Sequence, residues 1–157
     1  MVDLVYPIRT ATVDDIPVLI DFRARLFALV WKGGGSIEEM NAYSKDYFKE
    51  KMESGEVLAW VAESESGEVV GTAMLSFYYL TPKPSNIEGK YGYLSSMYVL
   101  EEHRRKGIGR RLVRAVLDHA KEIGLQCVKL HASDHGVPLY ESTGFSAWNE
   151  MGITLDD

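Results

Sequence analysis

The stretch Leu94-Ser95-Ser96-Met97-Tyr98-Val99-Leu100 and the turn Arg104-Arg105-Lys106-Gly107-Ile108-Gly109 that follows it decide the fold. The first continues a strand that we expect from Tyr91, and the second opens a helix. A helix N-terminus carries unpaired backbone N–H groups and the positive end of the peptide dipoles, and glycines let an anion approach it closely. Gly107 and Gly109 therefore predict an anion-binding turn, with positive charge added by Arg104, Arg105 and Lys106.

The spacing of these glycines matches neither of two common phosphate-binding turns. A dinucleotide-binding turn needs a third glycine, and a P-loop needs Gly-Lys followed by Ser or Thr. Both are missing after Gly107. Taken alone, Gly-x-Gly also fits an ordinary connection from a strand to a helix with a solvated basic face, so the rest of the chain has to decide.

Downstream of the turn, apolar residues recur at helical spacing up to Gly124, where a left-handed cap is expected; they are Ile108, Leu112, Val116, Ala120 and Ile123. Residues 126–131 read as a strand. Strand, helix and strand make a right-handed βαβ unit, which predicts two parallel neighbouring strands. A last helix through Tyr140 and a strand from Phe145 to Leu155 complete the chain.

Upstream, we expect a short strand over Val5 to Arg9 and a helix that runs from Ile16 toward three glycines at 33–35. Ser36, with Glu39 three residues later, indicates the capped start of a second helix that stops at Gly55. Residues 57–62 and 69–79 flank a polar turn and predict a hairpin. Pro82 and Pro84 place a surface loop before the strand that begins near Tyr91.

The composition favours one domain over residues 1–157, because 46% hydrophobic residues suffice for a single core. The net charge of −6 argues against nucleic-acid binding, which needs a broad basic surface. Residues 1–6 show no leader pattern and no segment is apolar enough to span a membrane, so we expect a cytoplasmic protein without a membrane partner. Cys127, the single cysteine, reads as a packed, inert thiol.

Two patterns at the right distance, Arg104-x-x-Gly107-x-Gly109 after a strand and Leu139-Tyr140-Glu141-Ser142-Thr143-Gly144-Phe145, resemble the GCN5-related N-acetyltransferase (GNAT) family over almost the whole chain. The resemblance implies an α/β (α+β) fold with a mixed sheet of six to seven strands, flanked by about four helices, in the order β-α-α-β-β-β-α-β-α-β. It also implies an acyltransferase that moves an acetyl group from acetyl-CoA to an amine by direct attack in a ternary complex.

The family's cofactor contacts carry over to specific positions here. The resemblance assigns the coenzyme A pyrophosphate to Arg104, Arg105, Lys106, Gly107, Ile108, Gly109 and Arg110, and the pantetheine arm to the backbone of Met97, Tyr98 and Val99. A bulge around Ser96 and Met97 would offer a backbone N–H to the thioester carbonyl. Tyr140 matches the tyrosine near the cofactor sulfur, where a phenol can protonate the leaving thiolate; its structural alternative is a core aromatic.

The sequence departs from the family at the proton acceptor. Many relatives have a glutamate on the fourth strand, where this chain has Tyr93, so Tyr93 or Ser95 would have to relay the amine proton through water. An asparagine and an alanine of the family are replaced by Ser133 and Gly136; Ser133 can still hydrogen-bond the cofactor. His131 offers another proton acceptor or a structural histidine. His131 and His135 need not share a face, so we expect no metal site.

The acceptor is expected to be a small-molecule or peptide amine. In the family its groove is usually walled by the first two helices and the loop between them, here residues 31–36, with help from the loop at 78–90. Aromatic side chains there, together with Glu38, Glu39 and the acidic balance of the chain, favour a positively charged amine. The same rings fit a core or a homodimer contact equally well. The missing glutamate also motivates a second hypothesis, a non-catalytic acyl-CoA-binding sensor. A third, that the basic residues 104–114 contact nucleic acid, is disfavoured by the acidic remainder.

Overall fold

The computed structural model describes residues 6–155 and contains one five-stranded sheet in the order β1-β2-β3-β4-β5. The strands are β1 (Ile8–Thr10), β2 (Val57–Glu63), β3 (Val69–Tyr79), β4 (Lys90–Val99) and β5 (Val128–Leu130). The helices are α1 (Ile16–Val30), α2 (Ile37–Ser54), α3 (Ile108–Glu122) and α4 (Val137–Ser142), with 3-10 turns η1 (Val13–Asp15) and η2 (Glu101–His103). Neighbouring strands are antiparallel except β4 and β5, which are parallel.

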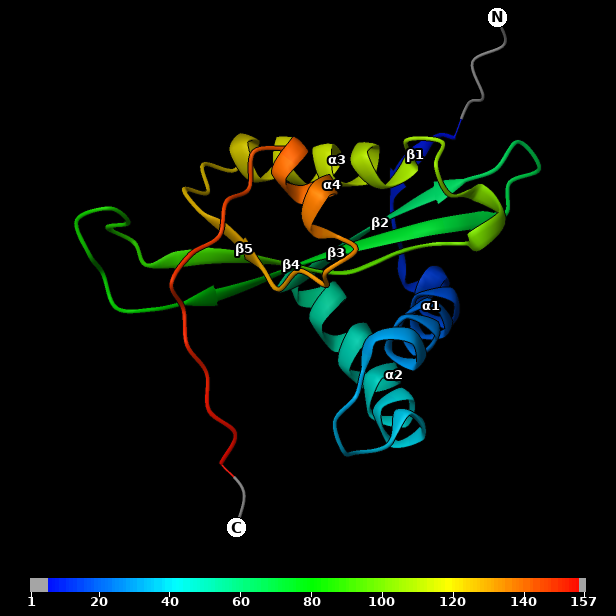
Figure 1. Ribbon diagram of the computed structural model, residues 1–157, viewed down its shortest axis with the longest axis horizontal. Helices are drawn as coiled ribbons and strands as arrows, with labels where there is room; N and C mark the ends of the chain where they lie inside the picture. The colour runs from blue at the N-terminus through cyan, green and yellow to red at the C-terminus, as the bar shows by residue number, and fades with distance from the viewer. Residues whose placement is uncertain (1–5, 156–157) are drawn as a thin grey trace, which may run out of the picture.

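Helices cover both faces of the sheet (Figure 1). Helices α3 and α4 lie on one face, and α1 and α2 lie on the other. The buried core divides accordingly. Leu75, Leu94 and Leu112 belong to the cluster under α3, whereas Leu19, Phe48 and Met74 belong to the cluster under α1 and α2. The strands between the two helical layers thus contribute alternate side chains to two cores.

Most of the expected elements are present within a residue or two of the expected bounds. Ser36 caps α2 by accepting a hydrogen bond from the Glu39 backbone, and Gly55 ends that helix in a left-handed conformation. Gly124, after α3, is also left-handed. The strand expected from Val5 begins at Ile8; Val5, like the rest of residues 1–5, lies outside the described residues.

The strand expected over Phe145–Leu155 is wrong, so the sheet has five strands and not six or seven. Pairing requires a neighbouring edge, and β5 is only three residues long. The segment is tied to β5 by side chains instead, because Lys129 pairs with Glu150 and lies over the Trp148 ring. Phe145 packs against the core, whereas other apolar side chains of the segment are left exposed, among them Met151 at 95% and Leu155 at 88%. The fold class remains that of the family.

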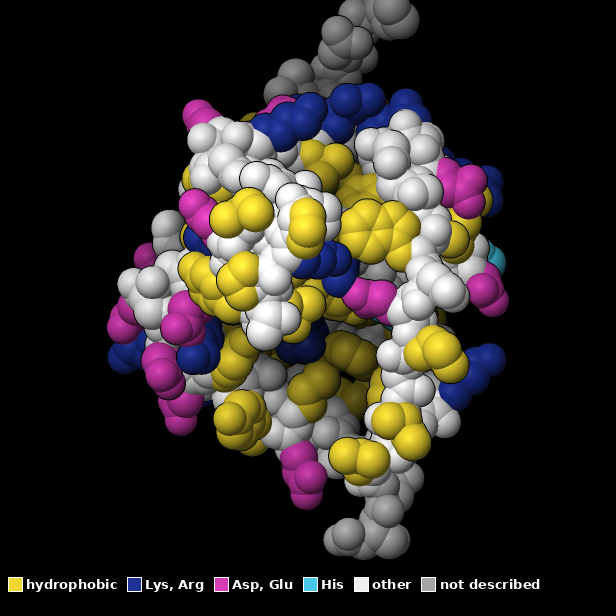
Figure 2. Space-filling model, turned by 90° about the vertical axis from the view of Figure 1, so that its left-hand side faces the viewer, with side chains coloured by type: hydrophobic (Ala, Val, Ile, Leu, Met, Phe, Trp, Pro, Cys, Tyr) yellow, Lys and Arg dark blue, Asp and Glu magenta, His cyan; other side chains and the backbone are white. Residues whose placement is uncertain are grey.

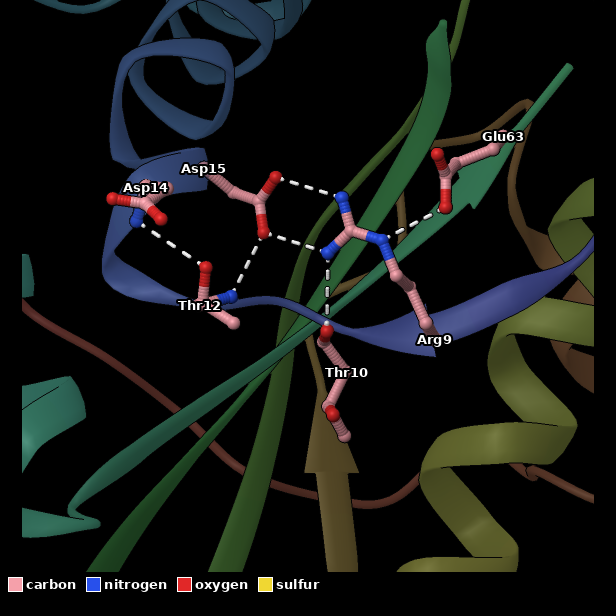
Figure 3. A network of polar contacts seen from close by, with 6 residues as sticks. All are labelled: Arg9, Thr10, Thr12, Asp14, Asp15 and Glu63. Atoms are coloured by element: carbon pink, nitrogen blue, oxygen red, sulfur yellow. Dashed lines mark hydrogen bonds and ion pairs between the residues drawn. The ribbon is translucent and has the colours of Figure 1, made fainter. Parts of the chain in front are cut away.

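A charged network at the start of α1 fixes this helix to the sheet (Figure 3). The Arg9 guanidinium on β1 donates to both carboxylate oxygens of Asp15, at 2.8 and 2.9 Å, and to Glu63 at 2.8 Å. Asp15 also accepts from the Thr12 backbone, and the Thr12 hydroxyl accepts from Asp14. The Arg9 guanidinium holds the pKa of the Asp15 carboxyl below its ordinary value. The Arg9 charge is therefore paired with two carboxylates of the protein, Asp15 and Glu63.

Candidate functional site

Strand β4 contains a bulge at the expected place. Opposite β3, Thr72 pairs with Tyr98 and Met74 pairs with Ser95, so one residue of β3 faces two residues of β4, Ser96 and Met97. Ser96 has a φ of 58°, which is left-handed and unusual for a residue with a side chain. Such a conformation costs on the order of 1–3 kcal/mol and is kept where neighbours enforce it. The buried Thr72 hydroxyl does so by donating to the Ser96 carbonyl at 3.1 Å.

The bulge reverses which face the β4 side chains occupy. Leu94 packs in the core under α3, whereas Tyr98, four residues later, packs edge-on against Phe22 of α1. In a regular strand these two residues would point the same way. The extra residue thus breaks the ladder at Ser96 and Met97, and backbone N–H groups there are free to point elsewhere.

Beyond the bulge, one edge of β4 has no strand beside it. Strand β5 pairs with β4 only from Gly92 to Leu94, while β4 continues to Val99. The two parallel strands therefore separate, and the backbone of β4 over residues 95–99 offers donors and acceptors to an extended ligand, apart from the Val99 carbonyl, which accepts from Arg104. Met97, Tyr98 and Val99, the residues expected to contact the pantetheine arm, lie on this edge.

The glycine turn ends at the start of α3, close to the bulge. A Cβ built on Gly109 would lie 3.3 Å from Leu139 of α4 and 3.9 Å from Met97, so α3, α4 and the bulge converge there. Arg105 and Gly107 are both left-handed, with φ of 62° and 80°. No side chain caps α3, in contrast to α2, so its first backbone N–H groups remain available to an anion.

The basic side chains of the turn divide into two groups. Arg104 turns back onto β4, where its Nε donates to the Val99 carbonyl at 2.8 Å and its guanidinium lies over the Tyr98 ring. Arg105, Lys106 and Arg110 are exposed, and among residues 6–155 none of them forms an ion pair. The second group is therefore better placed than Arg104 to meet an anion at the turn.

Tyr140 is half-buried on α4, next to Leu139, and packs edge-on against Phe145. Its hydroxyl forms no hydrogen bond to another described residue. Burial raises the pKa of the Tyr140 phenol above its ordinary value, so the proton stays on the oxygen at neutral pH. The arrangement suits a proton donor.

The remaining expected residues lie around this region in less specific positions. The Ser133 hydroxyl accepts from the Gly136 backbone at 3.3 Å, which stabilises the turn before α4. Tyr93 pairs with Ser76 on the face covered by α1 and α2, with its ring against Tyr78. Cys127 is half-buried just before β5, less enclosed than a core thiol, and burial raises its pKa.

His131 and His135 are exposed, and within the described part of the chain no three metal-binding side chains come together. None of the described helices is long and apolar enough to cross a membrane.

Arg23, from the middle of α1, reaches the bulge from the sheet face opposite α3 and α4. Its Nε donates to the Ser96 hydroxyl at 3.0 Å, and its guanidinium lies 5.4 Å from the centres of the Phe27 and Phe48 rings. The sequence motifs do not indicate this residue. A signal does exist: Ile16, Leu19, Arg23 and Phe27 share one helix face, which places a charge within an apolar stripe.

The sequence pattern of the Acetyltransferase (GNAT) family matches residues 24–145, and the chain belongs to this family. An uncharacterized N-acetyltransferase of Bacillus subtilis, YhfO, is 33% identical over 63% of this chain and 65% of its own length. The glucosamine 6-phosphate N-acetyltransferase of Schizosaccharomyces pombe is 34% identical over 55% of this chain and 75% of its own. A predicted acetyltransferase of Clostridium acetobutylicum, solved with acetyl-CoA, superposes with a TM-score of 0.86 at 26% identity, covering 97% of this chain and 96% of the other.

These relatives support acetyl transfer as the general activity of the fold. The acceptor that a relative's name gives is a property of that relative. The curated relatives are matched over only part of their lengths, from 26% to 75%.

Proposed function

We propose that this protein transfers the acetyl group of acetyl-CoA to an amine of a small molecule or peptide, by direct attack while both substrates are bound. The observation that carries the proposal is the bulge at Ser96 and Met97, which opens beside the unpaired edge of β4 and the uncapped start of α3. The structural relative solved with acetyl-CoA supports the choice of donor. No metal takes part in this scheme.

In this proposal the donor lies along the face of α3. The pyrophosphate meets the first backbone N–H groups of the helix at Gly107, Ile108 and Gly109, with charge from Arg105, Lys106 and Arg110. Arg104 contributes by holding the Val99 carbonyl and the Tyr98 ring, so that it positions the strand. The pantetheine arm pairs with the backbone of Met97, Tyr98 and Val99. Ser133 supports α4 and, through it, Tyr140.

The chemistry needs an oxyanion site, a proton donor and a proton acceptor. The amine nitrogen attacks the thioester carbon, and backbone N–H groups of the bulge stabilise the oxyanion that forms. When the C–S bond breaks, Tyr140 gives its proton to the thiolate, and the phenolate regains a proton from water. The amine loses its proton to a water held near Tyr93 or Ser95. The product is an amide and free coenzyme A.

The amine acceptor itself is supported by the fission yeast relative, whose name gives an amino sugar phosphate as its substrate. The test is a screen of acetyl-CoA against small amines, amino acids, polyamines and peptides, with thiol release and a mass gain of the acceptor as joint readouts. Both signals are expected for one acceptor class. Tight binding of acetyl-CoA without turnover of any acceptor would favour a sensor instead, and absence of binding would contradict the proposal altogether.

A further inference from the structure

Arg23 carries a charge at the bulge that no carboxylate of residues 6–155 neutralises. The side chain is half-buried, and within residues 6–155 no carboxylate lies within ion-pair distance of it. Burial lowers the pKa of the Arg23 guanidinium below its ordinary value, and only Tyr47 opposes this effect. A half-buried charge without a counter-ion is costly, and two aromatic rings compensate it only in part.

The geometry leaves the binding end of the guanidinium unused. The Arg23 Nε donates to the Ser96 hydroxyl, and this hydrogen bond anchors the planar group at the bulge. The two terminal nitrogens form no hydrogen bond to another described residue. A planar fork of this kind matches the two oxygens of a carboxylate or phosphate, and charge-assisted pairs are the strongest hydrogen bonds that proteins make.

The position of Arg23 places it on the acceptor side of the sheet. It comes from α1, on the face opposite α3, and it meets β4 at the residue where the ladder is broken. Figure 2 shows a hollow below the centre of one side of the molecule, with hydrophobic side chains around it and the C-terminal segment to its right. Because Arg23 joins α1 to the bulge, an amine that approaches the bulge from the side of α1 and α2 would come close to its guanidinium.

We propose that the acceptor amine carries a carboxylate or phosphate group, and that Arg23 binds this anion and so orients the amine at the bulge. The inference rests on the proposed acetyl transfer and narrows its acceptor. It also replaces the expectation of a purely cationic acceptor, because Glu38 and Glu39 are exposed at the start of α2, whereas Arg23 is at the bulge itself. A second positive charge near Arg23 would be repelled.

The test compares matched acceptors in the wild-type protein and in Arg23→Gln. Each amino acid is paired with its carboxamide, and phosphoethanolamine is paired with ethanolamine, which separates carboxylate from phosphate recognition. We expect wild type to prefer the anionic member, and Arg23→Gln to raise KM for that member by about tenfold or more, since charge-assisted pairs are worth about that much. KM for acetyl-CoA and for the member without the carboxylate or phosphate should stay unchanged. Arg25→Gln, on the same helix but exposed, is the matched control.

Three results would overturn the inference. One is a wild-type enzyme that acetylates the members with and without the anionic group equally well. Another is an Arg23→Gln variant in which KM rises to the same extent for both members of a pair. That result is expected if Arg23 only supports the structure. If no acceptor is turned over, the proposed acetyl transfer fails, and the inference is tested separately by binding. Calorimetry then measures the affinity of the anionic acceptors for the coenzyme A complexes of wild type and Arg23→Gln. Equal affinity for the two proteins overturns the inference. Arg23→Lys, which keeps the charge, should retain part of the preference and serves if Arg23→Gln does not fold.

Discussion

Arg9 and Arg23 both join α1 to the sheet, and they do so in opposite ways. Arg9 forms ion pairs with two carboxylates, Asp15 and Glu63, so the protein itself neutralises its charge (Figure 3). Arg23 meets a hydroxyl and two aromatic rings, beside a strained residue in β4. The first arrangement is complete in the free protein. The second leaves a charge and a broken ladder for a ligand to complete, so we expect stability to depend on the first region and reaction to depend on the second.

The largest effect is expected from Tyr140→Phe, which belongs to the reaction region. Loss of the proton donor should lower kcat by about 100-fold with little change in KM for acetyl-CoA. Because burial raises the pKa of the phenol, the wild-type rate should begin to fall on the alkaline side only above about pH 10. Steady-state thiol release as a function of pH measures both. A rate that survives the substitution would leave Tyr140 as a core aromatic.

Asp15→Asn tests the completed region. Hydrogen bonds to charged groups contribute about 1.5–3 kcal/mol each, and water screens part of this because Arg9 is 40% exposed, so we expect a loss of about 1.5 kcal/mol. The pKa of Asp15 is lowered in the folded state, so its contribution is present above about pH 4 and disappears as the pH falls through the folded value. Urea unfolding at neutral and acid pH should show wild type and variant converging, with kcat unchanged at neutral pH.

Thr72→Val probes the support of the bulge, where the two regions should separate most clearly. The substitution keeps the shape but removes the donor to the Ser96 carbonyl, at a cost of about 1 kcal/mol in unfolding free energy. If the bulge forms the oxyanion site, Thr72→Val should lower kcat, whereas Asp15→Asn should leave kcat unchanged although it costs more stability. If Thr72→Val and Asp15→Asn showed the same loss of stability and the same kcat, the two regions would not differ in function.

Arg25→Gln is expected to have the smallest effect. The residue pairs with Asp21 one turn earlier on α1, and both side chains are about half exposed, at 53% and 52%. Pairs of this kind contribute about 0.3–0.5 kcal/mol. Chemical unfolding should therefore place the variant within about 0.5 kcal/mol of wild type, and a larger loss would show that α1 depends on more than the Arg9 network.

The donor side of the molecule could be predicted from the sequence because its signals are local. A strand, a glycine turn and an apolar stripe follow each other within 91–124, and their order requires parallel strands. The bulge at Ser96 was accessible only through family resemblance, since two consecutive serines carry no bulge signal. The direction of Arg104 could not be read at all, because it depends on the Val99 carbonyl and the Tyr98 ring nearby in space.

The acceptor side was harder, because its signals are tertiary. Arg23 interrupts the apolar stripe of α1, but only the fold shows that Ser96 is its partner and that no carboxylate within residues 6–155 pairs with it. The C-terminal segment has apolar residues suited to a strand, yet strand formation depends on an available edge, and its side chains meet β5 at Lys129 instead. The pairing of two distant segments cannot be predicted from the sequence of either segment alone.

A crystal structure with acetyl-CoA tests the central claim most directly, namely that the bulge of β4 and the start of α3 hold the acetyl donor. The account predicts the pyrophosphate at the backbone of Gly107 to Gly109, the thioester oxygen at a backbone N–H of Ser96 or Met97, and the sulfur near the Tyr140 hydroxyl. A donor bound elsewhere, or a thioester that lies away from the bulge, would contradict it.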